Sequence, residues 1–427
     1  MKNNNKKWLR LDNAAKIYPA TKRKNWSNVF RLSISLKEDI DVTVLQKAVD
    51  TTIKRFPSIA VCLKRGFFWF YLEQVEKAPK VQAEKPYPCS QMSYKEMKKC
   101  SFRVLYYKNR IAIEFFHALT DGNGGLVFLK TLAAEYITQK YGTIVENVDG
   151  VLNREDVPKD EEIEDSFLKY DGEVSKSRKE KTAYKLKGTG EESGYRNLIT
   201  GILDVNEVLA KAKEYKVSLT TFIASVMIYV IEEIQKQDIP QRKKQKPVKV
   251  LIPVNLRNFF NSASLRNFVL FITPGINPKL GEYSFDEIVR SVHHEMGFEL
   301  TSKQMGSRIT KNVKAEKLLV LKLTPLFIKN VVMKAVYKTV GEKKSCITLS
   351  NLGAVTLPCN MKKYVSRIDF VLGVQATCPN NCGILSYNGK LYINFIRNIK
   401  EPTLERKFFT FLKEMGLDVE IESNQKD

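Results

Sequence analysis

The feature that most constrains the fold is a strand pattern that changes into a helix pattern across a short turn. Residues 102–117, FRVLYYKNRIAIEFFH, contain two β-rich runs around a polar turn and therefore predict a hairpin. The second run ends at His117, and the pattern LVFLKTLAAEYITQKY predicts a helix that begins near Gly124 or Gly125. A chain with this change of period is expected to be α/β.

Strand and helix patterns continue to alternate along the chain. Asp41 is placed to cap an amphipathic helix that Pro57 stops. Further strands are expected at 28–36, 66–73, 198–204, 248–257, 268–276, 345–353, 367–374 and 390–396, and further helices within 204–236 and 405–417. Both halves mix strands and helices, which is consistent with two related α/β lobes.

The length of the chain also favours two lobes. Its 427 residues exceed the usual size of a single core, and 43% hydrophobic residues are enough to build real cores. Hydrophobic periodicity fades where an acidic run, REDVPKDEEIED, precedes a basic one, SKSRKEKTAYKLK. We therefore expect an N-terminal lobe at 1–150, a charged, solvated linker at 151–195 and a C-terminal lobe at 196–427.

The charge of the chain is strongly positive. Lys and Arg number 70 against 47 acidic residues, which gives a formal net charge of +23. Such a chain attracts polyanions, among them nucleic acid, anionic lipid, an acidic carrier protein and a phosphorylated cofactor. The alternative is a solvated, Lys-rich surface without a specific partner. No signature of a nucleic-acid module is present, so specific nucleic-acid binding is not expected.

The N-terminal and cysteine patterns predict a cytoplasmic protein. The first residues are polar and basic and lack the apolar core of a signal peptide, and no run of about 18 apolar residues predicts a membrane span. Seven scattered cysteines are typical of a reducing compartment. Cys378 and Cys382 form a C-x₃-C pair without a second pair, so we expect no metal site there.

The stretch that follows the predicted hairpin, HALTDG, carries candidate chemistry. A histidine at a strand end can project into a cleft and take a proton near neutral pH. Asp121 could contact the imidazole of His117, or it could pair with an arginine and brace the turn. Gly122 would let the backbone approach a ligand. The alternative is a core histidine followed by an ordinary helix cap.

Three segments carry a resemblance to a known superfamily. HALTDG matches the H-x-x-x-D-G active-site motif of CoA-dependent acyltransferases and nonribosomal peptide condensation domains, which include chloramphenicol acetyltransferase. Residues 253–275 resemble the strand end and Asn-Phe strand of these proteins. LSNLGAV at 349–355 resembles the Ser-Asn-x-Gly turn of their bacterial alcohol acetyltransferase-like branch. The three segments follow the family order, so the resemblance covers nearly the whole chain.

The chain also departs from parts of that superfamily. Condensation domains usually carry two adjacent histidines, whereas Phe116 occupies the first position here, which favours a simple acyltransferase. The Asp-Phe-Gly-Trp-Gly motif of plant acyltransferases is absent, and residues 369–373 lack its Trp. His293 and His294 are not followed by Asp-Gly, so a position on a helix surface is expected for them.

The resemblance implies an α/β fold and a role for each motif residue. The fold would be two chloramphenicol-acetyltransferase-like lobes, with mixed sheets flanked by helices and a tunnel between the lobes. His117 looks like the general base. Asp121 looks like a structural brace, with Arg257 as its candidate partner. Ser350 and Asn351 are candidates to stabilise an oxyanion, or they only form a tight turn.

The implied activity is O- or N-acyl transfer from acyl-CoA to an alcohol or amine, with no metal and no tightly bound cofactor. One alternative keeps the family and changes the donor to a phosphopantetheine thioester on an acyl carrier protein. Another is a catalytically silent relative that acts as a binding or scaffold module. A monomer is expected, because two covalently joined lobes can form the cleft alone.

Overall fold

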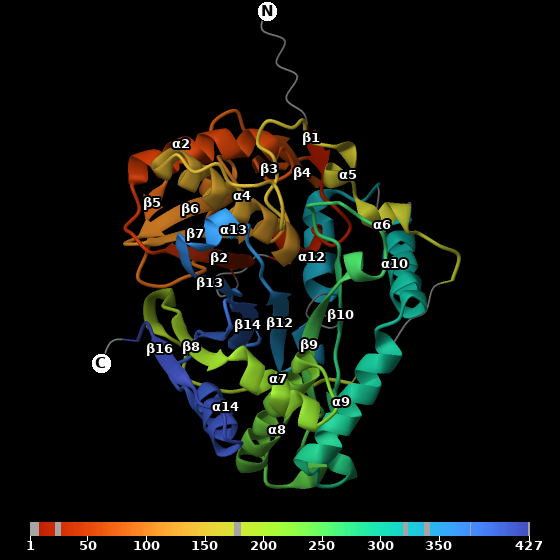
Figure 1. The fold of residues 1–427 in the computed structure, drawn as a ribbon. Coiled ribbons are helices and arrows are strands. Elements are labelled where there is room, and N and C mark those ends of the chain that lie inside the picture. Colours follow the sequence, from red (N-terminus) through yellow and green to blue (C-terminus); the bar gives the residue numbers. More distant parts are fainter. Residues whose placement is uncertain are drawn as a thin grey trace, which may run out of the picture.

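Two α/β lobes lie one above the other in the computed structural model (Figure 1). The structure describes residues 8–21, 27–174, 181–318, 323–336, 342–375 and 377–425. Within these ranges the upper lobe contains a five-stranded sheet and a three-stranded sheet of order β1-β4-β3, and the lower lobe contains an eight-stranded sheet.

The sheet of the upper lobe has the order β13-β2-β7-β6-β5. The helices α2 (Val42–Thr52) and α4 (Gly122–Tyr141) pack against each other, and α4 also packs on β2 and β7. The strands of this lobe are β1 (Trp8–Arg10), β2 (Val29–Leu36), β3 (Val61–Arg65), β4 (Phe70–Gln74), β5 (Gln82–Ala83), β6 (Phe102–Tyr107), β7 (Arg110–Phe116) and β13 (Val365–Val371).

The hairpin expected before His117 is present, since β6 and β7 pair in antiparallel register. Its turn uses Lys108 at a positive φ of 48°. The expected cap of α2 is also present, because the Asp41 carboxylate accepts hydrogen bonds from two backbone N–H groups of the first turn.

The strand expected at 66–73 begins later than predicted. Gly66 to Trp69 form a turn between β3 and β4, where the N–H of Gly66 donates to the Trp69 carbonyl at 2.9 Å.

The lower lobe is built around a mixed sheet of order β10-β9-β12-β14-β15-β8-β16, with β11 paired to β9. Helices α9 (Phe285–Glu299) and α14 (Thr403–Glu414) both pack against α8 (Leu219–Asp238) at the bottom of the molecule in Figure 1. The strands are β8 (Asn197–Asp204), β9 (Val248–Asn255), β10 (Val269–Ile272), β11 (Gly275–Ile276), β12 (Ile347–Ala354), β14 (Asn380–Tyr387), β15 (Lys390–Arg397) and β16 (Glu420–Ser423).

The remaining α-helices complete both lobes. They are α1 (Ile17–Thr21), α3 (Tyr94–Met97), α5 (Asp160–Ile163), α6 (Ser166–Lys169), α7 (Val205–Glu214), α8 (Leu219–Asp238), α9 (Phe285–Glu299), α10 (Ser302–Lys317), α12 (Leu326–Val336), α13 (Cys359–Lys362) and α14 (Thr403–Glu414). Within the described residues no single helix is long and apolar enough to cross a membrane; α7 and α8 meet that test only as a pair bent by 78°.

One strand of the upper sheet comes from a distant part of the chain. β13 pairs with β2 in antiparallel register, with Ile368 opposite Ile34 and Phe370 opposite Leu32. Both Ile368 and Phe370 are buried in the core of the upper lobe. The chain therefore leaves the lower lobe after β12, adds one strand to the upper sheet and returns to form β14.

The stretch expected to be a charged linker is partly buried. Phe167 belongs to the core of the lower lobe. Glu162 accepts two hydrogen bonds from the guanidinium of Arg55, at 2.6 and 2.8 Å, and both side chains are largely buried. These contacts attach the segment to both lobes. The lobe boundaries at 150 and 195 stay a prediction.

We expect Arg55→Met to lower the free energy of unfolding by about 3 kcal/mol, because it leaves the buried Glu162 charge without its partner. The double variant Arg55→Met/Glu162→Leu should regain most of that loss, since it removes both charges. Urea unfolding followed by circular dichroism measures both values. A single variant as stable as the wild-type protein would show that the ion pair does not hold the segment in place.

Candidate active site

His117 lies at the end of β7, where the upper lobe meets the connection between β9 and β10. Its backbone N–H donates to the Asn28 carbonyl at 2.8 Å, which fixes the start of the turn. Its half-buried ring stacks on Tyr18, with 4.5 Å between centroids and 13° between planes. Phe30 contacts the same ring edge-on at 5.1 Å. Two aromatic side chains thus restrict the imidazole to one orientation.

Asn267, two residues before β10, determines which nitrogen of His117 carries the proton. The Nδ1 of His117 lies 3.2 Å from the Oδ1 of Asn267. The Nδ2 of Asn267 donates to the Oδ2 of Asp12 at 3.3 Å, and the backbone N–H of Asn267 donates to the same oxygen. Because an ionised carboxylate only accepts hydrogen bonds, the amide oxygen of Asn267 faces the histidine. The Nδ1 of His117 therefore donates, and Nε2 keeps its lone pair.

Burial shifts the pKa values of Asp12 and His117, which Asn267 connects. It raises the pKa of Asp12 to about 6, although the nearby Arg266 opposes the shift. It lowers the pKa of His117 below the usual 6.5, and Asp121 and Asn267 oppose that shift only in part. A histidine with a lowered pKa is neutral at pH 7 and can accept a proton.

Asp121 is the N-cap of α4, and its carboxylate joins the two lobes. Its Oδ1 accepts from the N–H of Gly124 at 3.0 Å. Its Oδ2 accepts from the backbone N–H of Phe268 at 2.9 Å and from Nη1 of Arg257 at 2.8 Å. Of the two contacts considered for Asp121, the structure contains the ion pair with Arg257.

Arg257 binds more than the motif aspartate. Its guanidinium also donates to the Oδ1 of Asn255 at 3.1 Å and to the carbonyls of Ser264 and Arg266, each at 2.7 Å from Nη2. These bonds hold the connection between β9 and β10 in a fixed shape. Because Asn267 lies in this connection, directly after Arg266, Arg257 also positions the side chain that orients His117.

Gly124, two residues after the motif, has less room for a side chain than Gly122. A Cβ built there would lie 2.2 Å from the carbonyl oxygen of Leu265, which is backbone and cannot rotate away. A Cβ on Gly122 would meet only the end of the Leu352 side chain, at 2.6 Å. Gly122 is the first residue of α4, so it belongs to the helix start rather than to a free turn.

Ser350 and Asn351 lie in β12, beside the start of α4. Leu352, the next residue, contributes the side chain that faces Gly122. Asn351 donates to the hydroxyl of Thr220 at 3.0 Å and accepts from the N–H of Gly353 at 2.8 Å, where φ is +77°. Asn351 thus lies where the register of β12 with β14 shifts, between Asn351 and Ala354, so the tight turn considered for this stretch is a bulged strand instead. A role for it or Ser350 in stabilising an oxyanion stays a prediction.

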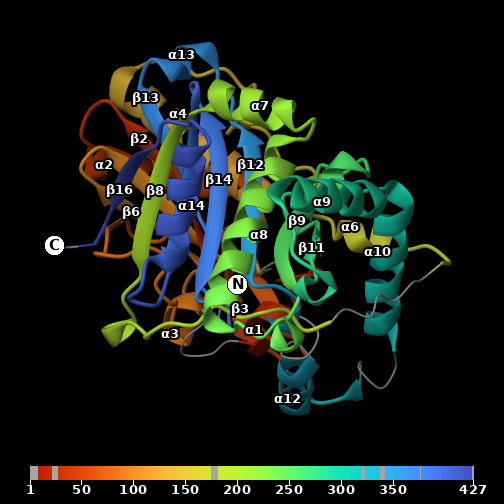
Figure 2. The same cartoon turned by 90° about the horizontal axis from the view of Figure 1, so that it is seen from below.

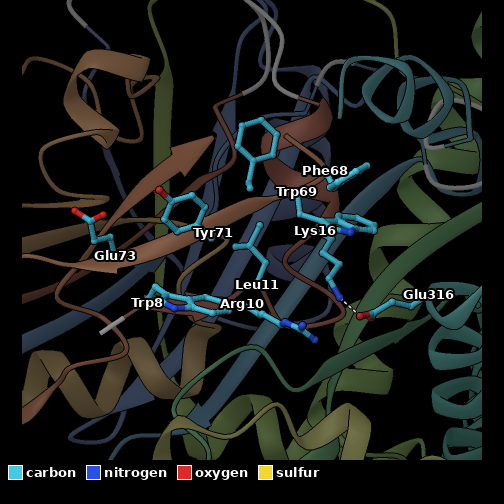
Figure 3. A pocket seen from close by; sticks show the side chains of 10 residues that line it. Trp8, Arg10, Leu11, Lys16, Phe68, Trp69, Tyr71, Glu73 and Glu316 are labelled. Carbon is cyan, nitrogen blue, oxygen red and sulfur yellow. Dashed lines mark ion pairs between the residues drawn. The ribbon is translucent and has the colours of Figure 1, made fainter. Parts of the chain in front are cut away.

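A pocket of about 710 Å³ is lined in part by the N-terminal segment, and His117 is not among its lining residues. Trp8, Leu11, Lys16, Phe68 and Trp69 are among its lining residues, and Lys16 forms an ion pair with Glu316, which also lines the pocket (Figure 3). Leu11 and Lys16 belong to the same N-terminal segment that supplies Asp12 and Tyr18 to the histidine. The tunnel expected between the lobes stays a prediction.

The structure adds three residues that the sequence did not single out as site residues: Tyr18, Asp12 and Asn267. Only Asn267 lay in a segment noted for its resemblance. His293 and His294 are exposed on α9, as expected. Across the described ranges, no group of three or more His, Cys, Asp or Glu residues is placed to hold a metal ion.

We expect Gly124→Ala to lower the free energy of unfolding by about 2 kcal/mol or more, because the new methyl group collides with the Leu265 carbonyl. Gly122→Ala is the matched control, and it should cost clearly less because Leu352 can change rotamer. Thermal unfolding of both variants gives the comparison. Equal losses would contradict the close approach at Gly124.

No family model and no curated protein matches this chain. Solved structures do match over nearly its whole length. TRI101 of F. graminearum, complexed with coenzyme A and T-2 mycotoxin, is 10% identical with a TM-score of 0.62, and the match covers 98% of this chain and 100% of that chain. Polyketide synthase associated protein 5 from Mycobacterium tuberculosis is 13% identical with a TM-score of 0.57, covering 94% and 96%.

A third match is the starter condensation domain of rhizomide synthetase RzmA, in complex with C8-CoA and Leu-SNAC. It is 12% identical with a TM-score of 0.60, and the match covers 95% of this chain and 94% of that chain. The expected fold class is confirmed by these likenesses. The chain has the two-lobed, chloramphenicol-acetyltransferase-like α/β fold that acyltransferases and condensation domains share.

Proposed function

We propose that the protein transfers an acyl group from acyl-CoA to an alcohol or amine, with His117 as the general base. One arrangement carries the proposal: the imidazole of His117 is held between Tyr18 and Asn267, with Nδ1 bound and Nε2 left as the base, and burial lowers its pKa. A general base must be deprotonated and oriented at the working pH, and this arrangement supplies both conditions.

The proposed reaction needs one proton transfer at His117. Nε2 takes the proton from the acceptor O–H or N–H as the acceptor atom attacks the thioester carbonyl carbon. The tetrahedral intermediate then breaks the carbon–sulfur bond, and the departing thiolate takes the proton from the imidazolium. The products are an ester or amide and free CoA thiol, and the base is regenerated without a covalent enzyme intermediate.

Negative charge develops on the carbonyl oxygen during that attack. Ser350 and Asn351 are our candidates to donate to it, because β12 brings the neighbouring Leu352 against Gly122 at the start of α4. Asp121 and Arg257 act as positioning residues, since they hold the segments on either side of His117. We place no metal and no tightly bound cofactor in this reaction.

The donor is proposed from charge and from the matched structures. A net charge of +23 steers the phosphates of coenzyme A toward the protein. TRI101 and the RzmA domain are structures with coenzyme A and C8-CoA, respectively. We further propose a cytoplasmic monomer, because one chain supplies both His117 and Asn267.

We expect calorimetry to show stoichiometric binding of coenzyme A at moderate salt. ATP is the control for attraction of phosphate to the basic surface, and it should bind much more weakly. His117→Ala should bind coenzyme A like the wild-type protein but transfer acyl groups about 10²–10⁴-fold more slowly, since general-base catalysis is lost. Release of free thiol from acyl-CoA measures the transfer.

Two results would contradict this proposal. Coenzyme A binding no tighter than ATP binding would contradict acyl-CoA as the donor. A pull-down with a phosphopantetheine-loaded carrier protein would then distinguish an enzyme with a carrier-bound donor from a catalytically silent relative. Full activity in His117→Ala would show that His117 is not the general base.

We also expect the transfer rate to rise with pH and to reach a plateau, with a midpoint below 6.5. The sign follows from the lowered pKa of His117, because the imidazolium below that pKa cannot accept a proton. Asn267→Ala should move the midpoint to lower pH, since it removes a hydrogen bond that favours the charged ring, and should also lower kcat. A midpoint that stays fixed in Asn267→Ala would show that Asn267 does not contact the working base.

A further inference from the structure

Helix α12 exposes its apolar side chains and buries its charged one. Phe327, Ile328, Val331 and Val332 are between 43% and 68% exposed, whereas Lys329 is only 2% exposed. A surface helix of a globular protein normally shows the opposite arrangement, with its apolar stripe toward the core. Within the part of the chain that the structure describes, no other segment covers the exposed apolar side of α12.

Specific polar contacts hold α12 in this orientation. The Nζ of Lys329 donates to the Phe68 carbonyl at 3.0 Å and lies 3.6 Å from the ring centroid of Trp69. The N–H of Leu326 donates to the Phe67 carbonyl at 2.9 Å. The helix is thus anchored on the turn between β3 and β4 through its polar side, which leaves the apolar side outward.

The same turn extends the exposed apolar surface. Phe67 and Phe68 are themselves exposed and contact each other edge-on at 4.9 Å. We call the combined surface the apolar face; it consists of Phe67, Phe68, Phe327, Ile328, Val331 and Val332. Figure 2 shows α12 projecting at the edge of the molecule. Contiguous exposed apolar surface of this kind marks an interaction site.

The charge around the apolar face indicates what covers it. α12 contains no acidic residue, Lys334 in its last turn is exposed, and the exposed Arg65 directly precedes the turn of Phe67. Apolar side chains flanked by cations are the arrangement by which interfacial helices bind anionic lipid. A second copy would bring a chain of charge +23 against another, which repulsion opposes.

We propose that the apolar face docks on a lipid surface that carries anionic headgroups. The aromatic and aliphatic side chains enter the boundary of the acyl chains, and Lys334 and Arg65 contact the headgroups. Phe68 also lines the pocket of about 710 Å³, and α12 packs against α1, which carries Tyr18. Docking would thus bring that pocket to the lipid surface. The proposal does not depend on the acyl transfer proposed above.

The test is sedimentation of the full chain with vesicles of phosphatidylcholine plus phosphatidylglycerol, compared with phosphatidylcholine alone. We expect binding to the anionic vesicles that weakens as salt is raised. Phe327→Ser/Val331→Ser should weaken it about tenfold or more, because two large apolar side chains no longer leave water. Both side chains are exposed, so circular dichroism should show an unchanged fold.

Phe298→Ser is the matched control: Phe298 lies on α9 and is 64% exposed, against 62% for Phe327. It should leave vesicle binding unchanged. Absence of binding to anionic vesicles overturns the proposal, as does an equal loss in the control. Concentration-dependent dimers that Phe327→Ser/Val331→Ser abolishes, without vesicle binding, would also overturn it and assign the face to a second copy.

Discussion

The carboxylate of Asp121 is the interaction on which the arrangement of the site depends. It caps α4 from the upper lobe and accepts from Phe268 and Arg257 of the lower lobe. Each of its oxygens accepts a hydrogen bond. The buried carboxylate therefore links α4 to the β9–β10 connection, which is far away in the sequence. A buried carboxylate that accepts from three donors holds all three in place, so it keeps the start of α4 against the β9–β10 connection.

By holding the β9–β10 connection in place, Asp121 and Arg257 position Asn267 beside the half-buried ring of His117. β7 and Tyr18 place the ring from the upper lobe and the N-terminal segment, while Asn267 fixes its Nδ1 proton from the other side. Neither lobe alone supplies both contacts. The motif aspartate therefore influences His117 mainly through the backbone that it holds, and only secondarily through its charge.

Local patterns predicted much of the fold and part of the site. The hairpin before His117, the cap at Asp41 and the pair of Asp121 and Arg257 follow from period, capping chemistry and the resemblance. Asp12 and Tyr18 could not be found this way, because they lie in a polar segment whose sequence carries no motif. Only long-range packing brings Tyr18 onto the ring of His117 and Asp12 onto Asn267. The same holds for Gly124, whose close neighbour, Leu265, is 141 positions away along the chain.

The path of β13 has a consequence for how the protein is made. The upper sheet needs residues 365–371 to pair with β2 and to bury its core, yet these residues leave the ribosome long after residue 150. Until then β2 presents an unpaired edge, and such edges promote aggregation. The first lobe in the sequence is thus completed only when the second has been almost fully synthesised, so its folding is coupled to the rest of the chain.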